Sequence, residues 1–353
     1  MSRPNESRPW VPLGRVAGCG RTLTDVIARL RQPISPPFYR RITVMALVLL
    51  ILIVVTGAGV RLTGSGLGCT DWPNCTDKRF VAELETHQMV EFVNRLITGL
   101  VSMAVILAVL GSLRRAPRRR DLTWLSLGLV AGVVAQILLG ALVVLSHLNP
   151  WLVQGHFIVS MVLVLDAVVL AHRAGLPDEA TVRPAVTPAM LRWGSALVAL
   201  AVVVIGTGTL VTGSGPHSGH NATDVTVIRR LPIHVNDAAR IHGLAMIAFL
   251  VATIWVLVQL RRHGAPDHLQ RAGIALLTVL VLQGAIGYTQ YFTGVPPLLV
   301  GLHVLGASLV WVAVLRLRLE MQTPLESVVP GLRDSFSGIG TGNLPDGDLV
   351  PRR

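Results

Sequence analysis

Residues 136–156 read QILLGALVVLSHLNPWLVQGH, and residues 283–303 read QGAIGYTQYFTGVPPLLVGLH. Each stretch opens with a glutamine and has a glycine after three residues, a proline after nine more and a histidine after a further five. The apolar residues before the proline predict the end of one membrane helix, and those after it predict the start of the next. A histidine at the same place in two membrane hairpins indicates a paired cofactor site.

The composition of the chain is that of a membrane protein. Of its 353 residues, 52% are hydrophobic and only 14% are charged, and the mean hydropathy is +0.60. Soluble domains have about 25% charged residues. The formal net charge is +12, but the arginines form short clusters between apolar runs, as the positive-inside rule describes. We therefore expect contact with membrane lipid and no nucleic-acid partner.

Eight apolar runs are long enough to cross a bilayer, which takes about 20 residues each. They lie at about 42–60, 89–111, 122–146, 153–171, 193–212, 240–260, 272–291 and 298–315. The arginine clusters all fall on one side of the resulting topology, so we expect a multi-pass protein of the bacterial cell membrane with cytoplasmic N- and C-termini.

A second sequence repeat supports a duplicated architecture. Residues 56–66 read TGAGVRLTGSG and residues 205–215 read IGTGTLVTGSG, in the same order relative to the first repeat. Chance similarity among glycine-rich helices is the alternative, but two matches in one order favour duplication. We expect an all-α integral membrane protein whose eight transmembrane helices form two pseudo-symmetric four-helix bundles, a parallel internal repeat. The expected parts are a disordered basic tail at 1–41, a first bundle at 42–173, a cytoplasmic linker at 174–192, a second bundle at 193–316 and a disordered tail at 317–353.

Three histidines lie at a similar depth, near the outer ends of even-numbered spans: His156, His242 and His303. A single histidine in a membrane helix would more often make a helix–helix hydrogen bond, but three at one depth favour metal ligation. His242 and His303 can face each other across the second bundle. Two imidazoles on opposite faces of the iron are a common way to hold a haem.

The first half departs from this arrangement. The position equivalent to His242 is Asn94, and an amide is a poor iron ligand. His87, Glu91 and Asn94 share one helical face, opposite His156. One firm ligand near a carboxylate indicates a site where a molecule binds, reacts and leaves. The alternative for Glu91 is an ion pair with Arg95 four residues later.

Arginines and cysteines near the outer ends of the spans complete the candidate site. Arg61, Arg95 and Arg240 suit the carboxylates of haem propionates, with snorkelling to the interface as the equal alternative. Cys69 and Cys75 in the first outer loop predict a disulfide, either structural or redox-active.

One carboxylate, Asp166, lies deep in the fourth span. We interpret it as a buried hydrogen-bonding acid rather than as part of a proton path.

Together these residues resemble the haem A synthase family over about residues 40–320. The resemblance rests on the Thr-Gly-Ser-Gly segment, the Cys69–Cys75 loop with its Asp-Trp-Pro core, Glu91-x2-Asn94-Arg95 and the histidines of spans four, six and eight. It implies that His242 and His303 hold a permanent haem b, that His156 faces the substrate haem O, and that Glu91 is associated with catalysis. The implied reaction oxidises the C8 methyl of haem O to a formyl group through successive hydroxylations, giving haem A for cytochrome c oxidase.

Many members of that family have histidine where this chain has Asn94. Either His156 alone binds the substrate iron, or His87 replaces the missing ligand.

The resemblance also implies haem O synthase and cytochrome oxidase assembly proteins as partners, with a homo-oligomer as a further possibility. The competing hypotheses are a diheme transmembrane electron carrier and a haem-handling assembly protein without turnover.

Overall fold

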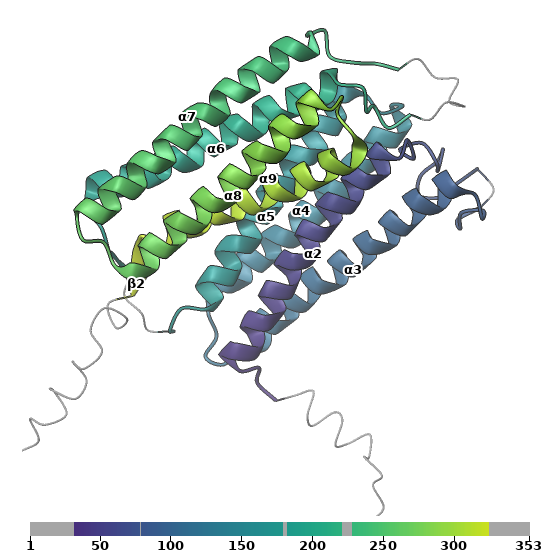
Figure 1. The fold of residues 1–353 in the computed structure, drawn as a ribbon. Helices are drawn as coiled ribbons and strands as arrows, with labels where there is room; N and C mark the ends of the chain where they lie inside the picture. Colours follow the sequence, from purple (N-terminus) through teal and green to yellow (C-terminus); the bar gives the residue numbers. More distant parts are fainter. Residues whose placement is uncertain (1–31, 78, 179–181, 221–227, 325–353) are drawn as a thin grey trace, which may run out of the picture.

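Eight long helices make up almost the whole of the computed structural model, which describes residues 32–77, 79–178, 182–220 and 228–324 (Figure 1). They are α2 (Pro36–Leu62), α3 (Thr86–Arg114), α4 (Arg120–Leu145), α5 (Pro150–Ala174), α6 (Pro188–Ser214), α7 (Val235–Arg262), α8 (Asp267–Phe292) and α9 (Pro297–Glu320). All eight are long and apolar enough to cross a membrane. The predicted all-α, multi-pass membrane fold is confirmed.

Proline sets the start of several helices. Pro36, Pro150, Pro188 and Pro297 occupy the first turn of α2, α5, α6 and α9, where the missing N–H would have no helical partner. Helix α2 therefore begins within the segment 1–41 that was expected to be a disordered tail. The hydroxyls of Tyr39 and Ser126 are 3.0 Å apart and join this early turn to α4. Residues 1–31 of the expected tail lie outside the described residues.

The other end of the chain also differs from the expected tail at 317–353. Helix α9 continues to Glu320, and strand β2 (Gln322–Pro324) follows it. This strand pairs antiparallel with β1 (Val182–Pro184), which lies in the expected linker 174–192. The two segments are thus joined by backbone hydrogen bonds. Residues 325–353 of the expected tail lie outside the described residues.

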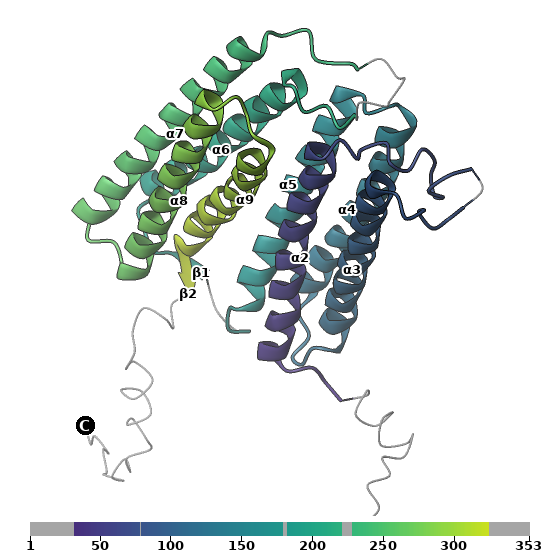
Figure 2. The same cartoon turned by 45° about the vertical axis from the view of Figure 1, so that its right-hand side comes forward.

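The helices pack as two groups of four, which Figure 2 separates. In each group, every helix contacts the next in sequence and the last contacts the first: α2, α3, α4 and α5 in one group, and α6, α7, α8 and α9 in the other. Between the groups, α2 contacts α9 and α5 contacts α6, as exchange of the two halves would require. The pseudo-symmetry axis itself stays a prediction.

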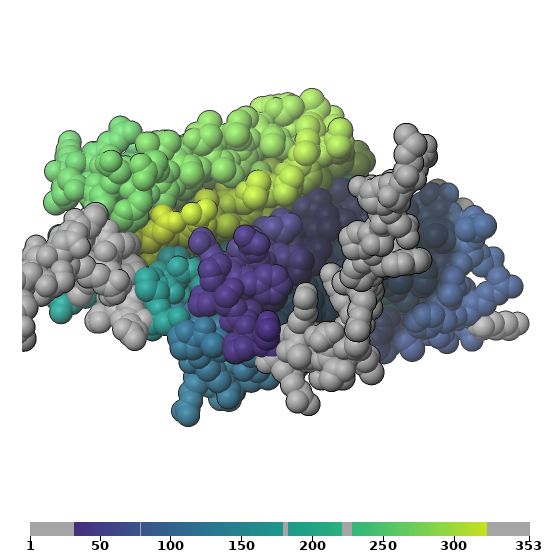
Figure 3. Space-filling model, turned by 90° about the horizontal axis from the view of Figure 1, so that it is seen from below, coloured from purple at the N-terminus to yellow at the C-terminus, as the bar shows by residue number. Residues whose placement is uncertain are grey.

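Helix α9 lies at the junction of the two groups, between α2 and the remaining helices of the second half (Figure 3). Buried polar contacts cross this junction. The indole N–H of Trp311 donates to the carbonyl of Met161 at 2.9 Å, and the hydroxyl of Thr209 donates to Oε1 of Gln154 at 3.1 Å. Because hydrogen bonds inside a membrane have no water to replace them, these contacts fix how the halves meet.

The two ends of the molecule differ in character. The start of α2 and strand β2 lie at one end, and the loops that join α2 to α3 and α6 to α7 lie at the other (Figures 1 and 2). The three histidines singled out by the sequence lie six or seven residues from the helix ends on the loop side.

Candidate functional site

His242 of α7 and His303 of α9 meet inside the second group of helices. The centres of their imidazole rings are 6.3 Å apart, and the ring planes are inclined by 73°. An iron atom between two imidazoles, about 2 Å from each ligating nitrogen, separates the ring centres by about 6 Å. The two histidines are therefore spaced as a bis-imidazole haem site requires.

Glycines let the rings of His242 and His303 lie directly on a neighbouring helix. A Cβ atom at Gly208 would come within 3.1 Å of Cε1 of His242, and one at Gly287 within 3.0 Å of Cε1 of His303. At Gly140 a Cβ atom would lie 3.5 Å from Cε1 of His156, which is an ordinary contact. Gly287 thus gives the His303 ring its place, a role that sequence reasoning did not assign, whereas Gly140 is not needed for the His156 ring.

Helix α6 orients the ring of His242. Its Nδ1 lies 3.1 Å from the carbonyl oxygen of Val204 and 3.2 Å from Oγ1 of Thr207. Because a carbonyl only accepts, Nδ1 carries the proton, and Nε2 is left with its lone pair for a metal. Thr207 was missed as a site residue. The signal that could have found it is its place in the repeated glycine segment, where the first half has Ala58.

His156 and His303 are held differently. In the described part of the chain, Nδ1 of each is buried without a hydrogen-bond partner. The contact that the two share is to the backbone: Nε2 of Gln136 donates to the carbonyl of His156 at 3.0 Å, and Nε2 of Gln283 donates to the carbonyl of His303 at 2.8 Å. The glutamine of the repeated motif therefore contacts the histidine twenty residues later.

Glu91 is buried in α3, with 6% of its surface exposed. Its Oε1 forms an ion pair with Arg95 at 2.6 Å, and its Oε2 accepts a hydrogen bond from the backbone N–H of Cys69 at 2.8 Å. The ion pair that the i, i+4 spacing offered as an alternative is present. Glu91 also fastens the outer loop to α3, which sequence reasoning did not anticipate.

The predicted Cys69–Cys75 disulfide is confirmed. The disulfide closes a loop that Arg95 binds, donating to the carbonyls of Asp71 at 3.2 Å and Asn74 at 3.0 Å. The loop is thus bound to α3 through Glu91 and Arg95 together. Whether the disulfide has a redox role stays a prediction.

The remaining candidate ligands of the first half occupy separate environments. Nδ1 of His87, in the first turn of α3, lies 2.9 Å from Oγ of Ser65. Oδ1 of Asn94 is buried and has no hydrogen-bond partner among the residues described.

The other two arginines expected near propionates differ from Arg95. Arg61 donates to the carbonyl of Thr212 at 2.6 Å and so joins α2 to α6. Arg240 is exposed and lies 3.6 Å from Oδ1 of Asp237. Propionate binding by these arginines stays a prediction.

Asp166 of α5 packs against Gly128 of α4. Within the segments that the structure describes, its carboxylate makes no hydrogen bond, so the interpretation as a hydrogen-bonding acid is not supported.

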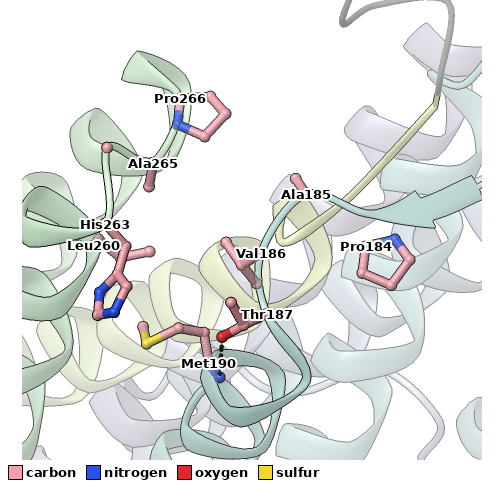
Figure 4. Close-up of a pocket in the computed structure, with 10 residues that line it drawn as sticks. Pro184, Ala185, Val186, Thr187, Met190, Leu260, His263, Ala265 and Pro266 are labelled. Carbon is pink, nitrogen blue, oxygen red and sulfur yellow. Dashed lines mark hydrogen bonds between the residues drawn. The ribbon is translucent and has the colours of Figure 1, made fainter.

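A cavity of about 370 Å³ lies at the opposite end of the molecule from the histidine sites. Figure 4 shows residues 184–187 and Met190 on one side of it, and Leu260, His263 and Pro266 on the other. It contains none of the predicted site residues, and it belongs to the junction of α6 with the loop between α7 and α8.

A known family matches most of the chain. The profile of the family described as cytochrome oxidase assembly protein matches residues 40–88 and 78–315. The chain belongs to this cytochrome oxidase assembly protein family. The predicted resemblance to haem A synthases is confirmed by relatives in the family that carry that name.

Three such relatives cover different shares of the chain. A haem A synthase of Lysinibacillus sphaericus is 32% identical over 120 residues, 34% of this chain and 39% of the relative. One of Bacillus pumilus is 32% identical over 134 residues, 37% of this chain and 43% of the relative. One of Staphylococcus saprophyticus is 25% identical over 284 residues, 76% of this chain and 91% of the relative. The chain thus spans about two fifths of the length of the first two relatives and nearly all of the third. Membership of this assembly-protein family implies that haem is involved.

Proposed function

We propose that the protein is a haem A synthase that oxidises the C8 methyl of haem O to a formyl group, supplying haem A for cytochrome c oxidase. The observation that carries the proposal is the 6.3 Å spacing of the His242 and His303 rings in one half, set against Asn94 in the other. A protein with one fixed haem and one unequal site fits an enzyme better than a diheme electron carrier, which needs two bis-histidine sites.

In the second half, His242 and His303 are the proposed ligands of a haem b. When bound, this group supplies one-electron oxidation and reduction. The Nδ1 proton of His242 is donated to the Val204 carbonyl, with Thr207 beside it, which would leave the Nε2 lone pair available to hold the iron. Gly208 and Gly287 give both rings room against the helix backbone.

In the first half, His156 is the proposed ligand of the substrate haem O. We infer that it acts alone, because His87 lies in the first turn of α3, about 10 Å along the helix from Asn94, the position equivalent to His242. A single protein ligand suits a haem that has to leave after reaction, since fewer bonds must be broken. Arg95 and Arg61 remain the candidates for propionate contacts.

Glu91 is the proposed catalytic carboxylate. It would accept a proton, or stabilise positive charge, as the methyl group is oxidised. Its two oxygens each accept one bond, from Arg95 and from the N–H of Cys69, and each keeps a second lone pair for a substrate contact. This links the carboxylate to the disulfide loop.

The proposed setting is a bacterial cell membrane with both termini cytoplasmic and the histidine sites near the outer face. Arginines dominate the segments on the terminal side, as the positive-inside rule requires of a cytoplasmic surface. Haem O synthase and cytochrome oxidase assembly proteins are the proposed partners.

The first experiment is extraction of the haems from purified protein made in cells that supply haem O. Haem A or its alcohol intermediate would support the proposal. Extraction of haem b alone, at one or two per protein, would contradict it and favour the electron carrier or a haem-handling protein.

The second experiment assigns Glu91. Glu91→Ala should lower haem A formation by about a hundredfold, the usual contribution of a positioned acid or base, while the haem b spectrum persists. Glu83→Ala is the control, because Glu83 is an exposed carboxylate in the same outer loop, and its side chain pairs with Arg79 at 2.8 Å. Normal haem A formation by intact Glu91→Ala protein would remove Glu91 from the mechanism.

A further inference from the structure

Gln283 holds the turn of α9 that carries His303. Only 6% of this glutamine is exposed, and its Nε2 donates to the carbonyl of His303 at 2.8 Å. Its Oε1 is buried, has no hydrogen-bond partner in the described part of the chain, and rests directly on Gly306. A Cβ atom at position 306 would overlap this oxygen. The amide therefore touches the 303–306 turn at two points.

Gln136 makes the equivalent contact in the first half with a different partner. Its Nε2 donates to the carbonyl of His156 and to Oγ of Ser160, and Ser160 itself donates to the His156 carbonyl at 2.9 Å. The position equivalent to Gly306 is Val159, so no glycine receives the amide oxygen here. The oxygen of Gln136 is again buried without a hydrogen-bond partner in the described residues.

A helix does not need these bonds for its own stability. The carbonyl of a residue inside an α-helix already accepts the N–H four residues later, so an added amide contact does not complete the backbone. A polar side chain in a membrane helix is costly, and it usually serves a purpose. What the contact does is fix the rotation and height of the histidine-bearing turn relative to the neighbouring helix. A metal ligand needs such support, because small displacements of the ring weaken the bond.

We propose that Gln283 and Gln136 are positioning residues that set the places of His303 and His156 by binding the backbone of each histidine. The inference rests on the proposed function, which makes the two histidines iron ligands. It adds that the backbone carbonyls of His156 and His303 are bound by Gln136 and Gln283. His242, in contrast, is held by hydrogen bonds to its ring. The closer of the two glutamine contacts, that of the Gln283 amide with Gly306, lies in the half proposed to keep its haem.

The test compares Gln283→Met with Ser308→Ala in the full-length purified protein. Methionine has nearly the same length and no hydrogen-bonding amide, and it is well tolerated among packed helices. Ser308 is the control, because it is fully buried in α9, the helix of His303, and donates to the carbonyl of Val304, the residue after His303. The readouts are the rate of haem loss to a haem-scavenging protein, the midpoint potential and the electron paramagnetic resonance signal of the bound haem.

We expect Gln283→Met to release haem about 10- to 100-fold faster than wild type, the range seen when the support of a metal ligand is removed. Its midpoint potential and resonance signal should shift, and those of Ser308→Ala should not. Gln136→Met should leave the second-half haem unchanged and weaken binding of added haem O. Wild-type retention, potential and signal in Gln283→Met would overturn the inference.

A further variant separates this inference from the proposed function. His303→Ala should abolish the low-spin haem spectrum; if the spectrum persists, the ligand assignment is wrong. If His303→Ala loses the haem and Gln283→Met behaves as wild type, only the role of glutamine is wrong. Should Gln283→Met not accumulate, Gly306→Ala tests the same contact, since its Cβ would displace the amide oxygen, and wild-type haem retention and potential there would overturn the inference.

Discussion

Thr207 and Ala58 occupy equivalent positions in the two halves, as do His242 and Asn94. Thr207 lies 3.2 Å from Nδ1 of His242, whereas the first half has Ala58 and, in place of the histidine, Asn94. The first half therefore lacks both a histidine at the position of His242 and a hydroxyl at the position of Thr207. This paired difference favours a first-half site that was not built to hold a haem permanently.

Restoring both residues should convert the first half into a fixed haem site. We expect Ala58→Thr/Asn94→His protein to retain a second tightly bound haem and to form haem A more slowly, because an iron with two protein ligands is harder to release. Asn94→His alone should retain the second haem less well. The measurement is haem per protein after gel filtration, together with haem A formation. An unchanged haem content in the double variant would contradict this account of Asn94.

The start of α3 depends on an exposed carboxylate. Glu85 is the N-cap residue, and its side chain accepts hydrogen bonds from the backbone N–H of Gln88 at 2.9 Å and of His87 at 3.2 Å. These bonds lower the pKa of Glu85, since they favour its charged form. The cap secures the turn just before Glu91.

A lowered folded-state pKa gives this cap a defined pH dependence. Its contribution to stability is present above about pH 4.3, the ordinary glutamate value, and is lost as the pH falls through the lower folded-state pKa. The protection of the amides of residues 87–91 against hydrogen exchange, taken relative to the intrinsic exchange rate at each pH, should therefore fall below about pH 4. The change should be much smaller in Glu85→Gln, which cannot ionise. An equal pH response in both proteins would rule out Glu85 as the titrating group.

The positions of the long helices were predictable from sequence, but several contacts between elements were not. Apolar length, proline at helix starts and the repeated spacing were enough to locate α5 and α9 and their histidines. Strands β1 and β2 are too short for any periodicity, and their pairing depends on where α9 ends. The bond from Cys69 to Glu91 joins a loop to a helix 22 residues later, and nothing in the local sequence encodes it.

The two halves act as one molecule because buried polar contacts join them. Trp311 of α9 is almost fully buried, and its indole N–H reaches the carbonyl of Met161 in α5, the helix that carries His156. Helix α5 carries the proposed ligand of one haem site, and α9 carries one of the two proposed ligands of the other, so the packing of α5 on α9 sets how those sites face each other. Loss of this contact should lower the stability of both groups of helices, not of one alone.

Trp311→Phe tests that coupling. The substitution removes the buried hydrogen bond and part of the ring, which should cost roughly 1–2 kcal/mol and lower the thermal unfolding midpoint by a few degrees. Trp124→Phe is the control, because Trp124 is 73% exposed on α4 and should contact mainly lipid. Both are measured by thermal unfolding in detergent, with haem absorbance as a second probe. Equal midpoints for the two variants would mean that the Trp311 contact does not join the halves. Trp311→Phe weakens the junction of the halves without changing a residue of either proposed haem site. If haem absorbance and helix content are lost at the same temperature in this variant, the two halves unfold as a single unit.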